Sequence, residues 1–128
     1  MIYMPRKKGK SKDPWLKLLG KVKLCGSSSA SRSRVKEVLI TKEDLEKQFT
    51  KQRGRCYWFG IPININDVFT THNPLAPSVD RLDNDRDYEK DNIVICTQFA
   101  NMGRGKCDER TFKKIMDEIV QYLCWDER

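Results

Sequence analysis

Long hydrophobic runs are missing from this 128-residue sequence, and no apolar stretch approaches the ~20 residues that a membrane-spanning helix needs. The first five residues turn directly into lysines, without the apolar segment of a secretory signal. The five cysteines are an odd number with irregular spacing, which is atypical of a disulfide framework and favours reduced thiols. These absences predict an intracellular protein with no membrane partner.

Acidic residues are scarce in only one part of the chain. Residues 1–40 carry 11 Lys and Arg against two acids, whereas residues 41–128 carry 14 against 16, so the net charge of +7 comes from the N-terminal part. Basic side chains bind the phosphate backbone of nucleic acids whatever its sequence. We therefore expect residues 1–34 to form a basic, partly flexible arm and residues 35–128 a separate domain. The alternative is a solvated tail without a partner. The arm residues expected to contact nucleic acid are Arg6, Lys7, Lys8 and Lys10.

The remaining pattern predicts an α+β domain. A capping box that begins at Thr41 indicates a helix to about Gln52, which Gly54 would end. Residues 78–82 and 92–97 are predicted to be strands, joined as a hairpin by a long polar turn.

Three further helices are expected outside this core. A short helix of two or three turns should follow Pro14, and another should begin at Gln98 and end before Gly103. The last helix is the clearest, and we expect it to cover the back of the domain. Its apolar residues recur at helical spacing: Phe112, Ile115, Met116, Ile119, Val120 and Leu123.

An ordered set of polar residues surrounds the predicted hairpin. The first strand and turn read Pro77-Ser78-Val79-Asp80-Arg81-Leu82-Asp83, the second strand opens with Asn92, and Phe99-Ala100-Asn101 follows it. This layout resembles the HNH (ββα-metal) nuclease superfamily, in particular its short phage-type and mobile-element members. In those members a strand ends in Asp-His or Asp-Arg, a second strand begins with Asn, and a helix carries a final His or Asn. The resemblance covers about residues 41–123.

The resemblance implies a ββα-metal hairpin and helix with flanking helices and a basic N-terminal arm. It makes Asp80 and Asn101 the ligands of one Mg²⁺ or Mn²⁺ ion, and it gives Asn92 the role of tying the long turn down by side-chain hydrogen bonds. Hard divalent ions prefer oxygen ligands and keep open positions for a phosphate. The implied function is hydrolysis of phosphodiester bonds by an endonuclease of the phage or homing type, with double-stranded DNA as the partner. The alternative is an HNH-like DNA-binding protein without catalytic activity.

One departure from the commonest family pattern concerns the base that activates water. The position usually held by histidine is Arg81, whose guanidinium stays protonated and accepts no hydrogen bond. Arg81 would instead grip the scissile phosphate. His72 is the only histidine and is the first choice as base, with Asp83, Tyr88 and a metal-bound hydroxide as alternatives.

A second departure concerns zinc. Many HNH domains hold a structural zinc with two Cys-x-x-Cys knuckles, but the equivalent places here read Cys56-x-x-Phe59 and Cys96-x-x-Phe99. Two thiolates do not complete the four-ligand zinc site. We therefore predict no structural zinc, with buried cysteines and packed phenylalanines instead. A small zinc-stabilised interaction module remains a third hypothesis.

Two cations follow Asn101 closely. Arg104 and Lys106 lie on a glycine-flanked turn, where they would contact a DNA phosphate just beyond the metal. A helix C-terminus has the same composition, which is the alternative. The oligomeric state and the target sequence stay open.

Overall fold

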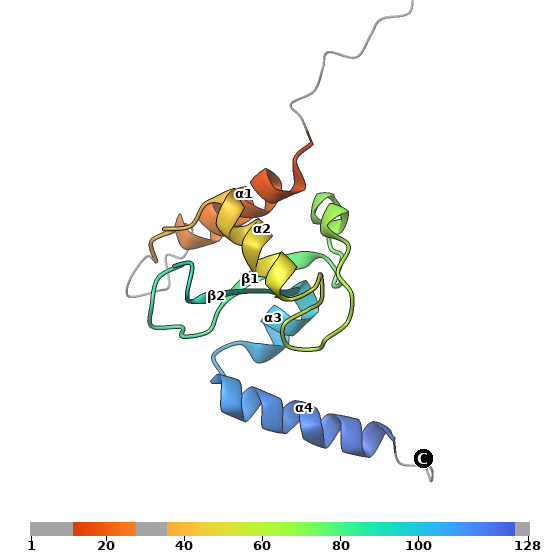
Figure 1. The fold of residues 1–128 in the computed structure, drawn as a ribbon. Helices are drawn as coiled ribbons and strands as arrows, with labels where there is room; N and C mark the ends of the chain where they lie inside the picture. The colour runs from red at the N-terminus through yellow and green to blue at the C-terminus, as the bar shows by residue number, and fades with distance from the viewer. Residues whose placement is uncertain (1–11, 28–35, 125–128) are drawn as a thin grey trace, which may run out of the picture.

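The computed structural model describes residues 12–27 and 36–124, and in residues 25–27 it describes only the backbone. The elements in chain order are α1 (Pro14–Ser27), α2 (Lys42–Lys51), the 3₁₀ helix η1 (Ile65–Phe69), β1 (Pro77–Arg81), β2 (Ile93–Thr97), α3 (Gln98–Arg104) and α4 (Glu109–Leu123). The two strands form an antiparallel sheet. In Figure 1, α1 and α2 lie above the strands and α3 and α4 below them. The expected α+β class is confirmed.

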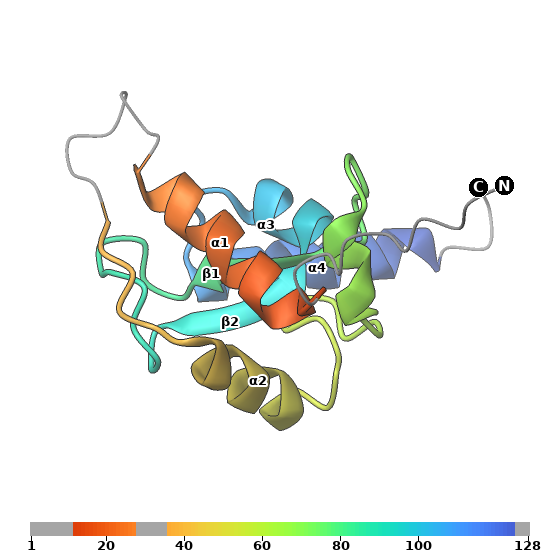
Figure 2. The ribbon, with the colours of Figure 1, turned by 90° about the horizontal axis from the view of Figure 1, so that it is seen from above.

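The hairpin lies at the centre of the core. Its register pairs Pro77 with Thr97 and Arg81 with Ile93. All five β2 residues are buried, because α1 and α2 cover the sheet on one side and α3 packs against both strands. Figure 2 shows α1 crossing over the strands and α2 running beside β2. A fully buried strand explains why β2 reads as a continuous apolar run.

The start of α2 agrees with the sequence. The Asp44 backbone N–H donates to Thr41 Oγ1 (3.3 Å), and the Thr41 N–H donates to Asp44 Oδ2 (2.9 Å), so the predicted capping box forms. Gly54 takes a positive φ of 69° just after the helix, in the region that favours glycine. Leu45 is fully buried on the inner face of α2.

Asn92 ties down the turn between the strands, as predicted. Its Oδ1 accepts from the Asp83 N–H (2.9 Å), and its Nδ2 donates to the carbonyl oxygens of Asp83 (3.1 Å) and Asp87 (3.0 Å). The side chain is 1% exposed, so its amide replaces backbone pairing that the long turn does not provide.

The N-terminal helix belongs to the core, which corrects the boundary expected at residue 34. Leu18, Leu19 and Val22 of α1 are buried in the same cluster as the strands, and the helix spans 14 residues rather than two or three turns. The apolar spacing of α1 lets it cover β1, and a net positive charge does not prevent this. The four expected arm contacts at residues 6, 7, 8 and 10 lie outside the described residues.

The last two helices also differ from expectation. Helix α3 continues through Gly103 and ends at Gly105, which takes a φ of 53°. Helix α4 forms over the predicted range but buries only Phe112, and most of its apolar face is exposed. The expectation that it covers the back of the domain is wrong, because the helix lies below α3, beyond the strands, and only Phe112 of its apolar side chains is buried (Figure 1). None of the helices in the described residues has the length and apolar composition needed to cross a membrane.

Replacing Asn92 tests the role of its amide. We expect Asn92→Ala to lower the free energy of unfolding by about 2–3 kcal/mol, because it leaves buried backbone groups of the turn without partners. Urea denaturation followed by circular dichroism measures this, with Lys90→Ala as the control on an exposed residue of the same turn. Equal midpoints for the two variants would show that the amide does not hold the turn.

Candidate metal and nucleic-acid site

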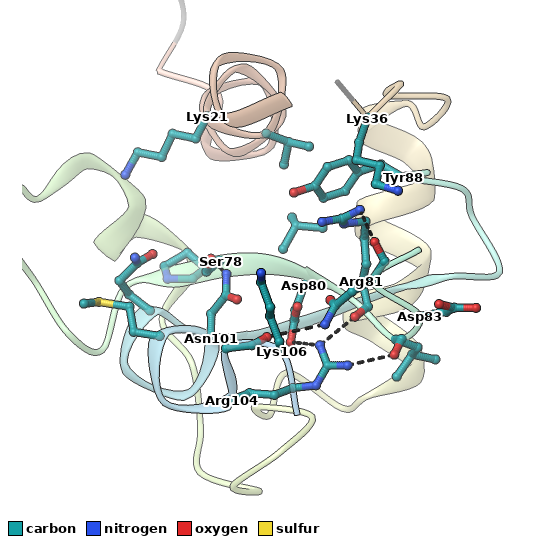
Figure 3. Close-up of a pocket in the computed structure, with 18 of the residues that line it drawn as sticks. Lys21, Lys36, Ser78, Asp80, Arg81, Asp83, Tyr88, Asn101, Arg104 and Lys106 are labelled. Carbon is teal, nitrogen blue, oxygen red and sulfur yellow. Dashed lines mark hydrogen bonds and ion pairs between the residues drawn. The ribbon is translucent and has the colours of Figure 1, made fainter. Parts of the chain in front are cut away.

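One open pocket of about 1140 Å³ lies between α1, β1, α3 and the hairpin turn. Figure 3 shows its lining, with Lys21 of α1 facing Ser78 and Asn101 across the opening. Polar side chains come from each of these elements, which are far apart in the sequence. The polar or charged lining residues are Lys21, Lys36, Ser78, Asp80, Arg81, Asp83, Asn84, Asp85, Tyr88, Gln98, Asn101, Arg104, Lys106 and Asp108.

The two expected metal ligands line this pocket together. Asp80 lies on β1 and is 6% exposed, and Asn101 lies on α3 and is half-buried. The Asn101 Nδ2 donates to Ser78 Oγ (2.7 Å). This bond orients the amide and leaves its carbonyl oxygen for another ligand.

Asp80 forms a buried ion pair that sequence reasoning missed. Its Oδ2 accepts from Arg104 Nη1 (2.9 Å) and from Trp58 Nε1 (3.0 Å). Arg104 is 1% exposed and its guanidinium lies over the Trp58 ring, 4.9 Å from the centroid. Asp80 Oδ1 has no hydrogen-bond partner among the described residues, so it is the carboxylate oxygen left for a cation.

Arg104 is therefore an internal residue, which corrects the expectation that it contacts a DNA phosphate. Besides Asp80, its guanidinium donates to the carbonyl oxygens of Arg81 (2.7 Å) and Leu82 (2.7 Å). The sequence does hold a signal for this position. Asn101 and Arg104 are three residues apart, so on a helix they share the face that points toward the strands.

The described residues offer few ligands for a divalent ion. Within residues 12–27 and 36–124, no three His, Cys, Asp or Glu side chains are grouped to hold a metal. The protein would thus offer one carboxylate oxygen and one amide oxygen, with the remaining positions left to water and phosphate, as Mg²⁺ often accepts. The nearby Arg104 charge weakens the pull of Asp80 on a cation.

Arg81 holds the hairpin turn. Its Nη1 donates to the carbonyl oxygens of Asn84 (2.8 Å) and Arg86 (3.0 Å), and its guanidinium lies over the Tyr88 ring at 5.0 Å from the centroid. The side chain is buried on the pocket wall. The two carbonyl oxygens and the Tyr88 ring already use part of the guanidinium. A contact between Arg81 and a DNA phosphate stays a prediction.

The candidate bases differ in whether they line the pocket. His72 is exposed in the loop between η1 and β1, with a positive φ of 55°, and it is not part of the pocket lining. Asp83 and Tyr88 both line the pocket. Asp83 is exposed, although its Oδ1 accepts the Asp85 N–H (2.9 Å), whereas Tyr88 is buried beneath Arg81. Geometry therefore favours Asp83 over His72.

Three lysines surround the opening. Lys106 is exposed just after α3, as the sequence suggested, and Lys21 and Lys36 were not singled out from the sequence. Lys21 Nζ donates to the Val68 carbonyl (2.8 Å) and Lys36 Nζ to the Asp85 carbonyl (2.8 Å). An ammonium group has three donors, so each can still bind an anion. Only the tertiary structure brings Lys21 of α1 to the same pocket as Lys36 and Lys106.

The two Cys-x-x-Phe segments are packed only in part as predicted. Cys56 and Cys96 are 2% and 0% exposed and Phe59 is half-buried, but Phe99 is 63% exposed, with its ring centroid 6.2 Å from that of Phe59. Burial raises the pKa of the Cys96 thiol far above its usual range. The absence of a structural zinc stays a prediction.

No family model matches this chain, and no curated protein matches its sequence.

The ion pair makes Asp80 a poor choice for testing catalysis. We expect Asp80→Ala to lower the free energy of unfolding by about 3–5 kcal/mol, because it leaves the Arg104 guanidinium buried without a counter-charge. Asp83→Ala, on an exposed carboxylate of the same pocket, should change it much less. Chemical denaturation of both variants is the measurement, and a small effect of Asp80→Ala would mean that water solvates Arg104.

Thiol accessibility tests the burial of Cys96. In the native protein we expect Cys124, which is exposed, to react quickly with a thiol reagent at pH 8, whereas Cys96 reacts only after unfolding. Burial keeps the Cys96 thiol protonated at that pH, and the thiolate is the reactive form. Mass spectrometry of labelled peptides assigns the sites. Fast labelling of Cys96 in folded protein would contradict the packing.

Proposed function

We propose that this protein is a metal-dependent DNA endonuclease of the HNH type, which hydrolyses phosphodiester bonds with one Mg²⁺ or Mn²⁺ ion. The observation that supports it is the shared position of Asp80 and Asn101, one from β1 and one from α3, on the wall of one pocket. The resemblance of the hairpin and α3 sequence to HNH nucleases points to the same two residues.

Several residues in and around the pocket have a part in this proposal. Asp80 Oδ1 and the Asn101 carbonyl oxygen would hold the ion, while Arg104, Trp58 and Ser78 keep both side chains in place. The bound ion would supply positive charge to stabilise the phosphate and its departing oxygen.

The base and the phosphate contacts come from the rim of the pocket. Asp83 is an exposed carboxylate that lines the pocket, so it would take the proton from the attacking water. Lys21, Lys36 and Lys106 would bind the flanking phosphates of the DNA backbone. The arm residues 6, 7, 8 and 10 would extend this contact along the duplex.

A second candidate function is DNA binding without cleavage. It is favoured by the ion pair between Asp80 and Arg104, because a carboxylate that already has a buried counter-charge binds a cation less strongly. The histidine outside the pocket lining favours it too. In this case the lysines would bind DNA and the Asp80 carboxylate would serve the fold alone.

Asn101 is the residue that tests catalysis most cleanly. Asn101→Ala removes one proposed ligand but only one hydrogen bond, so we expect about 1 kcal/mol loss of stability. Cleavage of plasmid DNA in Mg²⁺ or Mn²⁺ should fall by at least about a hundredfold, since even outer partners of a metal site contribute 10–100-fold. Gln98→Ala is the matched control, on an exposed residue of α3 that lines the same pocket.

Two further results complete this experiment. Removal of divalent ions with a chelator should abolish cleavage by wild type, and added Mg²⁺ or Mn²⁺ should restore it. If wild type binds DNA but never cuts it in Mg²⁺, Mn²⁺, Ni²⁺ or Co²⁺, the nuclease proposal fails and the DNA-binding candidate stands. Full cleavage by Asn101→Ala would remove this residue from the site.

A further inference from the structure

The pocket beside Asp80 has a helix on each side of β1. Helix α1 contributes one side of the lining through Leu18, Lys21, Val22 and Leu24, and α3 contributes the other through Gln98, Asn101, Met102 and Arg104. Asp80 lies on the strand between them, and its side chain is 7% exposed. Figure 3 shows α1 above the strand and Asn101 and Lys106 below it. A ligand that reaches Asp80 from the opening therefore lies between the two helices.

Positive charge comes from both sides of this pocket. Lys21 and Lys36 lie above the strand, and Lys106 lies below it (Figure 3). Lys21 and Lys36 each donate one hydrogen bond to a backbone carbonyl, and an ammonium group has three donors. A phosphodiester backbone that runs between α1 and α3 would thus meet a lysine on each side.

The lining as a whole is not strongly basic. Three exposed acids, Asp83, Asp85 and Asp108, lie among these lysines and limit the attraction for anions. A DNA duplex carries one negative charge per about 1.7 Å of its axis, whereas one strand carries one per about 3.4 Å. The balance of charges in the pocket therefore favours a single strand.

A regular duplex also does not fit between the helices. To bring a duplex phosphate to Asp80, α1 and α3 would lie on the two sides of one backbone, with one helix in each groove. The major groove is about 12 Å wide and admits an α-helix, which measures about 10–12 Å across with its side chains. The minor groove of about 6 Å does not admit one. An unpaired strand has no grooves and avoids this limit.

Two exposed apolar side chains line the same pocket. Leu24 on α1 is 68% exposed, and Met102 on α3 is 73% exposed. In a duplex the bases are stacked on one another, whereas an unpaired base offers its ring face to a protein side chain. The methionine thioether is polarisable and makes favourable contacts with aromatic rings. Lysines with apolar neighbours therefore suit a nucleotide whose base is unpaired.

We propose that this pocket binds one unpaired strand of nucleic acid, which runs between α1 and α3. Its backbone contacts Lys21, Lys36 and Lys106, and one base lies beside Met102. Single-stranded DNA is the form that agrees with the proposed nuclease, and single-stranded RNA offers the same chemistry. The inference rests on the nucleic-acid binding that both candidate functions share. It differs from the double-stranded DNA that the family resemblance implies.

Fluorescence anisotropy of the full chain with labelled oligonucleotides tests the form of the ligand. A chelator in the buffer prevents cleavage during the measurement. The probes are a single DNA strand, the duplex of the same sequence and an RNA strand of the same sequence. The single DNA strand should bind at least about tenfold more tightly than the duplex, because the duplex reaches only lysines and arginines outside the pocket.

Two lysine variants on opposite sides of the pocket test the path of the strand. Lys21→Ala and Lys106→Ala should each weaken single-strand binding about three- to fivefold and reduce its salt dependence by about 0.7 in log–log slope, because each loses one phosphate contact. Lys23→Ala is the matched control, on an exposed residue of α1 outside the pocket lining. Duplex binding should stay unchanged in all three variants. Circular dichroism checks the fold, since Lys21 also contacts the Val68 carbonyl.

Met102→Ala tests the contact with a base. It should weaken single-strand binding about fivefold, because the base loses an apolar surface to cover, and it should leave duplex binding unchanged. Leu75→Ala is the control, on a side chain that is 54% exposed and lies outside the pocket lining.

Each result separates this inference from the nuclease proposal. Equal or tighter binding of the duplex would overturn the single-strand inference, and cleavage of that duplex would leave the nuclease proposal intact. Equal affinities of the Lys21, Lys106 and Lys23 variants would show that the strand does not pass between the helices. Tighter binding of RNA than of DNA would support the single strand but count against DNA as the substrate. Single-strand binding without cleavage of any DNA would count against the nuclease proposal alone.

Discussion

The buried ion pair between Asp80 and Arg104 connects the parts of this fold. It joins β1 to α3, and the Trp58 indole N–H donates to the same carboxylate oxygen. Arg104 also holds the carbonyl oxygens at the end of β1, where the long turn begins. Removing two charges from water is costly, and the hydrogen bonds of Arg104 Nη1 and Nη2 offset part of that cost, while the buried Nε has no partner among the described residues. The pair therefore specifies how α3 sits against the hairpin.

The same pair sets the chemistry that the pocket can perform. One oxygen of Asp80 is committed to Arg104 and Trp58, which orients the carboxylate and partly neutralises it. A divalent ion at this position would be held by few protein ligands and would depend on phosphate oxygens from the substrate. Metal affinity and DNA binding would then increase together. In the proposed complex with DNA, Lys21, Lys36 and Lys106 at the rim of the pocket would supply the charge that attracts the phosphate backbone.

Helix α4 shows how a regular pattern determines an element but not its neighbours. Its apolar period predicts the helix correctly, and the same period led us to expect that the helix covers the domain. In the structure only the N-terminal half of α4 packs on the body, through Phe112 against Trp58 and Phe59 and through the half-buried Met116. An amphipathic helix needs an apolar surface to cover, but the spacing of its own residues does not say which surface that is.

The sequence by itself determined the local features of this protein. The capping box at Thr41, the two strands, the Asn92 amide in the turn and the last helix depend on neighbours in the chain, so their residue patterns predict them. Only the tertiary structure decided that α1 joins the core, that Arg104 turns inward and that His72 lies away from the pocket lining. From the sequence alone, a charged residue is predicted to lie on the surface unless its buried partner is known. The partner of Arg104 lies 24 residues away on another element, and no local period encodes that contact.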